Sequence, residues 1–205
     1  MKKMTFESKT KEEAKQQVLD AFRVSEDFIT INYTEKKGMF GLKRSYDVEA
    51  YVDVDVVELG LNTLKSMFDT MEVEAEIEVD TKPDTNEIAY LINTNENPVL
   101  IGKNGKTLEN IQYYLRNLLN LFTEEYQLVL VDIGGYKANR QKQLEILATK
   151  TAKEVARSKV PAKLSPMNAY ERRIIHTKLS EWRDVITSSE GETPNRYLVI
   201  KPKKR

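Results

Sequence analysis

Two glycines three positions apart form the stretch of this chain best suited to hold a sugar–phosphate backbone. The stretch reads Ile101-Gly102-Lys103-Asn104-Gly105-Lys106. Glycine has no Cβ atom, so the main chain of such a loop can approach a phosphate chain closely. A helix is expected to begin at the loop, and the N–H groups of its first turn would attract phosphate. The candidate binding residues are Gly102, Lys103, Asn104, Gly105 and Lys106.

A GxxG pair alone is a weak signal, because glycines are common in turns between helices. The surrounding pattern is more specific. Hydrophobic spacing predicts a helix over 56–71, strands over 72–80 and 88–93, a helix–turn–helix over 98–122 and a strand over 126–133. This α-β-β-α-α-β order is the context in which a KH module holds single-stranded RNA. The apolar lead-in, Val99, Leu100 and Ile101, is expected in the core.

The second candidate site is Arg172 with His176, the only histidine in the chain. The two residues are four apart on a helix predicted from Asn168 to about Trp182, so they share one face. Ile174 and Ile175 are expected to face the core. The pair could bind phosphate, or it could be an ordinary solvated helix face.

The first part of the chain reads as a small αβ unit ending near Val52. A strand over 5–8, a helix to about Arg23 and strands over 28–33 and 46–54 are predicted. Phe40 lies between two glycines in Gly38-Met39-Phe40-Gly41, and we interpret it as a candidate protein contact. Beyond Gly134-Gly135, a long basic helix is predicted to Ser158, with Lys150, Lys153 and Arg157 on a face beside the apolar one.

Charge is unevenly distributed, although the chain has 32 basic and 32 acidic residues. Residues 1–90 carry 12 Lys and Arg against 20 Asp and Glu, a net charge of −8, and residues 91–205 carry the reverse, +8. A polyanion is therefore drawn to the second half.

Several function classes receive no support from the residues. Cysteine is absent, which excludes disulfides and thiolate chemistry, and we expect a cytoplasmic protein without signal peptide or membrane span. Neither a nucleophile elbow nor a Walker loop is present, so no enzyme, catalytic residue, metal or cofactor is predicted. The alternating Glu72, Glu74, Glu76 and Glu78 favour a solvated strand face over a metal site. Tyr170 and Trp182 could stack on bases or pack in the core.

The chain resembles the Jag family of bacterial proteins, also named KhpB, EloR or SpoIIIJ-associated protein. The resemblance is carried by the GxxG stretch to Leu108, by Ile111-Gln112-Tyr113, by Gly135-Tyr136, by 166–176 (PMNAYERRIIH) and by Ser189-Glu190-Gly191. The segment 36–42 (KKGMFGL) resembles the signature of the family's first domain. Many members have a long charged linker after that domain, whereas only a few residues follow Val52 here.

The resemblance implies an α+β protein of three small αβ domains in series. These are a Jag-N domain (1–52), a type II KH domain (53–134) and an R-three-H domain (135–205). It also implies single-stranded RNA as ligand, a role in cell elongation and division, a heterodimer with a small single-KH-domain protein, and contact with membrane-associated envelope proteins. A homodimer is left open.

Two other functions compete with an RNA-binding regulator. One is a protein-assembly adaptor at the envelope machinery with incidental RNA binding, which Phe40 and the acidic first half favour. The weaker one is a ribosome-associated factor.

Overall fold

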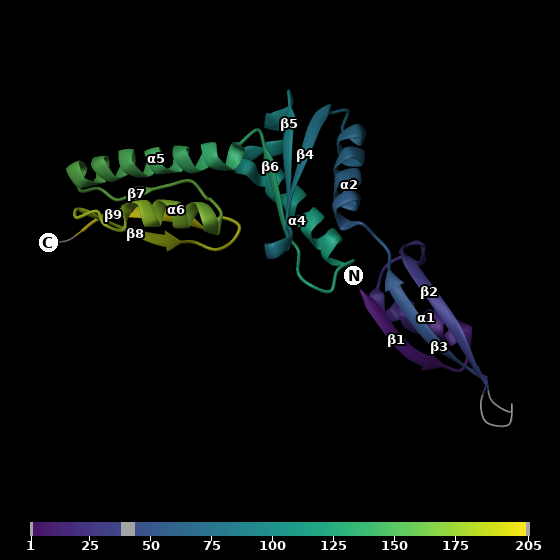
Figure 1. Ribbon diagram of the computed structural model, residues 1–205. Helices are drawn as coiled ribbons and strands as arrows, with labels where there is room; N and C mark the ends of the chain where they lie inside the picture. Colours follow the sequence, from purple (N-terminus) through teal and green to yellow (C-terminus); the bar gives the residue numbers. More distant parts are fainter. Residues whose placement is uncertain (1, 38–43, 204–205) are drawn as a thin grey trace. The chain divides into compact units, whose positions relative to one another are not determined.

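The computed structural model describes residues 2–37 and 44–203 (Figure 1). The chain divides into two compact units, Met1–Gly134 and Gly135–Arg205. Each contains small sheets with helices packed on them, so the predicted α+β class of small αβ layers in series is confirmed. Phe40 lies outside the described residues.

The first layer of unit 1–134 is an antiparallel sheet of order β1-β3-β2 with one helix. Val48, Ala50 and Val52 alternate on the buried face, as expected for a half-buried strand. The Thr10 side chain caps the helix by accepting from the Glu13 N–H at 3.1 Å. The elements are β1 (Lys3–Ser8), α1 (Lys11–Phe22), the 3-10 turn η1 (Glu26–Phe28), β2 (Ile29–Lys37) and β3 (Arg44–Val52).

The second layer follows after only Asp53, Val54 and Asp55 and has the predicted α-β-β-α-α-β order. Its sheet runs β4-β5-β6, with β4 antiparallel and β6 parallel to β5. The elements are α2 (Val56–Thr70), β4 (Ala75–Lys82), η3 (Pro83–Thr85), β5 (Glu87–Thr94), α3 (Asn97–Ile101), η4 (Lys103–Gly105), α4 (Lys106–Asn120) and β6 (Leu128–Ile133).

The backbone of α2 approaches the sheet very closely at Gly60. The hydroxyl of Tyr90, a fully buried residue of β5, donates to the Val57 carbonyl at 3.0 Å. A Cβ atom added at Gly60 would lie 2.0 Å from the Tyr90 oxygen, so the position requires glycine.

Apolar side chains connect the two layers of unit 1–134. The rings of Phe28 and Phe122 meet edge to face, with centroids 5.1 Å apart. Phe122 shares a core cluster with Val18, Phe22 and Val52. The first layer therefore packs against Leu118 of α4 and against Phe122, which follows that helix.

The unit 135–205 packs two helices and an antiparallel sheet of order β7-β9-β8 around one core. The helices α5 and α6 lie side by side (Figure 1). The predicted helix end at Trp182 is wrong, since α6 ends at Leu179 and Trp182 packs half-buried against the core. The elements are α5 (Tyr136–Ser158), β7 (Ala162–Lys163), α6 (Ala169–Leu179), β8 (Val185–Glu190) and β9 (Tyr197–Pro202).

Candidate nucleic-acid interface

The GxxG stretch forms a tight loop between α3 and α4. Gly102 (φ +70°), Asn104 (φ +54°) and Gly105 (φ +77°) all adopt positive φ. A Cβ atom at Gly102 would lie 2.1 Å from the Thr107 hydroxyl oxygen. Gly102 is therefore required by the loop, and the positive φ of Gly105 favours glycine at that position too.

The loop exposes its polar side chains at the beginning of a long helix. Lys103, Asn104 and Lys106 are exposed, whereas Gly105 is buried. Within the described chain, no side chain caps the N-terminus of α4. Lys106 lies 3.6 Å from Glu109, an exposed pair that leaves the ammonium in contact with solvent. An uncapped helix N-terminus beside two lysines can bind an anion.

The apolar lead-in to the loop is only partly in the core. Leu100 is fully buried, and Ile101 is half-buried. Val99 is 51% exposed, so its predicted burial is wrong. The reason is that α3 is a single short turn, and one turn can present only one side to the sheet.

Arg172 and His176 lie together on α6. Arg172 is half-buried and its Nη1 donates to the Met167 carbonyl at 2.7 Å, while His176 is exposed. The His176 Nδ1 is hydrogen-bonded to the hydroxyl of Thr187 on β8. Of the two isoleucines between them, Ile175 is fully buried and Ile174 packs half-buried against the core. The arrangement offers one exposed imidazole beside a partly engaged guanidinium.

Two interactions fix the helix that carries this pair. The Asn168 side chain caps α6 by accepting from the Glu171 N–H at 2.8 Å. The Glu171 carboxylate forms an ion pair with Arg140 on α5, at 2.7 Å. No spacing signal could have predicted this ion pair, because its partners are 31 positions apart.

The candidate residues fall into two groups in different units. Gly102 to Lys106 belong to unit 1–134, whereas Arg172 and His176 belong to unit 135–205. Tyr170 is 65% exposed on α6, as a base-stacking side chain would have to be. The sequence could not predict the hydrogen bond of Thr187 with His176, because it depends on strand β8 lying beside α6.

Net charge differs sharply between the parts of the chain. Residues 53–134 contain 5 Lys and Arg against 16 Asp and Glu, a net charge of −11. Residues 135–205 contain 17 against 7, a net charge of +10. The excess positive charge that a polyanion would meet therefore lies in the C-terminal unit.

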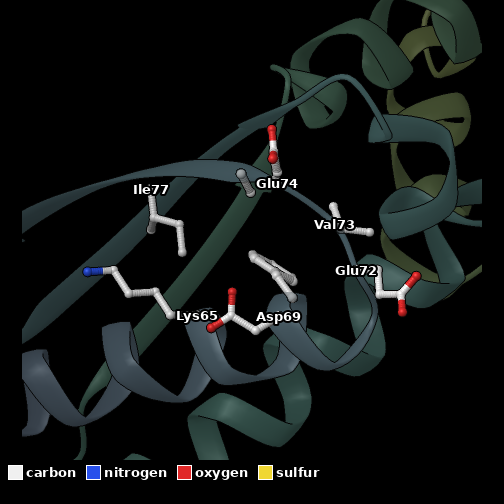
Figure 2. A pocket seen from close by; sticks show the side chains of 8 residues that line it. Lys65, Asp69, Glu72, Val73, Glu74 and Ile77 are labelled. Carbon is white, nitrogen blue, oxygen red and sulfur yellow. The ribbon is translucent and has the colours of Figure 1, made fainter.

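A hollow of about 530 Å³ lies between the end of α2 and the start of β4 (Figure 2). Lys65 and Asp69 rise from α2 toward Ile77 on β4, and Glu72 and Glu74 complete its polar rim. Three carboxylates against one ammonium make it unsuited to phosphate. Within the described residues, no group of three or more acidic or histidine side chains could hold a metal ion.

The acidic strand face is solvated as predicted for most of its length. Glu74, Glu76 and Glu78 are exposed, but the strand begins only at Ala75, because Glu72 has a left-handed backbone. Among residues 2–37 and 44–203, no helix is long and apolar enough to cross a membrane.

Comparison with known proteins identifies the C-terminal unit and the family. Residues 142–202 match the R-three-H domain. A Clostridium symbiosum protein named RNA-binding protein KhpB is 32% identical over 207 residues, covering 100% of this chain and 93% of the relative. The Bacillus subtilis (strain 168) protein of the same name is 30% identical, covering 100% of both. In the Streptococcus pneumoniae serotype 2 protein, 32% identity covers 75% of this chain and 46% of the relative.

The fold and this match define an α+β protein of small domains in series that contains an R-three-H domain. At 30–32% identity over its full length, the chain belongs to the KhpB family, also called the Jag family, which confirms the resemblance seen in the sequence.

Proposed function

We propose that this chain is a single-stranded RNA-binding regulator. The GxxG loop holds the backbone of about four nucleotides, as KH loops do. Arg172 and His176 contact phosphate or a flanking nucleotide from the R-three-H domain. The observation that carries the proposal is the exposure of Lys103, Asn104 and Lys106 at the uncapped start of α4. The names of the relatives, RNA-binding protein KhpB, support the same ligand.

The proposal divides the chain into a Jag-N domain (1–52), a type II KH domain (53–134) and an R-three-H domain (135–205). The parallel pairing of β5 with β6 and the α-β-β-α-α-β order support the KH assignment. It includes no catalytic step and places the protein in the cytoplasm.

Family membership supports the proposed partners. These are a small single-KH-domain protein, bound as a heterodimer, and membrane-associated envelope proteins, in a pathway of cell elongation and division. An adaptor function with incidental RNA binding is the second candidate, favoured by the net charge of −11 on residues 53–134, which opposes RNA.

The test replaces Lys103 and Asn104 by Asp. The matched control replaces Lys65 and Asn62 by Asp, which makes the same charge change at exposed positions of α2. We expect the loop variant to lose at least tenfold in affinity for single-stranded RNA, measured by fluorescence anisotropy, because carboxylates would face phosphate. Circular dichroism and thermal melting check that both variants fold. A folded loop variant that binds like the control would remove the loop from the RNA site and favour the adaptor function.

A further inference from the structure

A shallow groove of about 540 Å³ runs along α5 beside α6 in the C-terminal unit. Its lining combines four lysines, one carboxylate and an exposed aliphatic side chain. These residues are Lys142, Glu145, Ile146, Thr149, Lys150, Lys153 and Lys178. We propose that this groove, called here the lysine groove, is a second track for the phosphate backbone of single-stranded RNA. The inference rests on the proposed RNA-binding function.

The positive charge of the lysine groove is largely uncompensated. Its single carboxylate, Glu145, is engaged by Gln141 at 3.1 Å and by Lys178 at 3.3 Å. These contacts hold the pKa of Glu145 below its ordinary value, so it stays ionised and paired. Within the described residues, Lys142, Lys150 and Lys153 have no acidic partner. Three ammonium groups therefore remain for an external anion.

The three lysines lie on one face of α5. An α-helix turns by about 100° per residue, so positions 142, 150 and 153 fall within roughly 80° of one another around α5. At a rise of 1.5 Å per residue, they span about 16 Å of helix. A stacked strand advances about 3.4 Å per nucleotide, so the row matches about four to five phosphates.

The lysine groove is distinct from the face of Arg172 and His176. Lys178 is two residues beyond His176, about 200° around α6. Its ammonium contacts Glu145 on α5, whereas His176 contacts Thr187 on β8. The buried stripe of α6, which includes Ile175 and Leu179, separates the two sides. The domain thus presents two separate surfaces to a polyanion.

The apolar content of the lysine groove favours RNA over an acidic helix of a protein partner. Ile146 is 68% exposed, yet it lies in the row between Lys142 and Lys150. A docked amphipathic helix needs apolar anchors at successive turns, and the groove offers one. A single aliphatic surface between cations suits van der Waals contact of one base with Ile146, with phosphates on either side.

The test is a triple variant, K142Q/K150Q/K153Q, in the full chain. Its control, K9Q/K159Q/K203Q, removes the same charge at exposed positions outside the lysine groove. Glutamine keeps a high helix propensity, so α5 is expected to remain intact, as checked by circular dichroism. Affinity for a 20-nucleotide single-stranded RNA is measured by anisotropy at several salt concentrations. The groove variant should lose about tenfold or more in affinity, and its slope of log K against log[salt] should shrink by about 2, since each lost phosphate contact contributes about 0.7.

Each other result has a definite meaning. A folded groove variant that matches the control, while the unmodified chain binds RNA, overturns the lysine groove and leaves the proposed function standing. An unmodified chain that binds no RNA overturns both. If the groove variant keeps RNA affinity but loses binding to polyglutamate, the groove is a site for an acidic polypeptide and our inference is wrong.

Discussion

The guanidinium of Arg140 on α5 and the carboxylate of Glu171 on α6 form an ion pair 2.7 Å apart, with Glu171 only 4% exposed. The pair joins the two helices directly beside Arg172. Because a buried carboxylate is stable only when paired, this contact helps to fix the position of the α6 face that carries Arg172 and His176.

Glu171→Gln should destabilise the C-terminal unit by about 2 kcal/mol, because it removes the charge of a nearly buried carboxylate that accepts a hydrogen bond from Arg140. The matched control is Glu145→Gln, which breaks an exposed α5–α6 pair with Lys178 and should cost about 0.5 kcal/mol or less. Urea unfolding of the full chain measures both. Equal losses in the free energy of unfolding would mean that the Arg140–Glu171 pair stabilises the unit no more than the exposed pair does.

Gly60→Ala should destabilise unit 1–134 by about 1–3 kcal/mol, because the new methyl group overlaps Tyr90 in a packed core. The control Asn62→Ala, at an exposed position of α2, should be neutral or slightly stabilising. Adding Tyr90→Phe to Gly60→Ala removes the overlapping oxygen and should restore part of the loss. Thermal melting compares the variants, and a Gly60→Ala protein as stable as Asn62→Ala would contradict the close approach.

Arg172→Ala with His176→Ala should weaken binding of long RNAs that reach both sites, and leave a short oligonucleotide that fills only the GxxG loop almost unaffected. The reason is that the pair and the loop belong to different compact units. Anisotropy with RNAs of about 5 and 20 nucleotides separates the cases, with the exposed neighbour Arg173→Ala as control. Equal losses for both lengths, or none, would make the pair a solvated helix face.

Burial raises the pKa of the Tyr90 phenol. The unfolded chain ionises this group near pH 10, but the folded chain keeps it neutral to higher pH. The contribution of neutral Tyr90 to stability is therefore complete below pH 10 and is lost as pH rises above it. Between pH 9 and 11, the stability advantage of the unmodified chain over Tyr90→Phe should shrink by about 1 kcal/mol in urea unfolding. A constant difference would show that Tyr90 ionises equally in both states.

Local signals in the sequence were sufficient for most elements. The side chains of Thr10 and Asn168 cap α1 and α6, and such a cap depends only on residues within one turn. Within the predicted strand 46–54, Val48, Ala50 and Val52 do form the buried face of β3, although the strand ends at Val52. The predicted end of α6 was wrong because Trp182, an apolar residue at helical spacing, contacts the core from beyond the helix.

Contacts between distant segments could not be predicted. Phe28 meets Phe122 only after two sheets have formed, and Arg140 meets Glu171 only after α5 has packed on α6. The lysine groove has the same origin. Lys150 and Lys153 stood out as a basic helix face, but Lys178 joins them through the tertiary contact of α6 with Glu145.

Residues 53–134 and 135–205 carry opposite net charges, so their covalent connection matters for how RNA could reach the GxxG loop. On the proposed function, the covalent connection would present RNA bound by the C-terminal unit to the GxxG loop at an effective concentration on the order of millimolar, as for a short linker. The loop can then be occupied with little affinity of its own, although residues 53–134 carry a net charge of −11. Cutting the chain between Gly134 and Gly135 would keep the residues of both candidate sites and still remove most of this avidity.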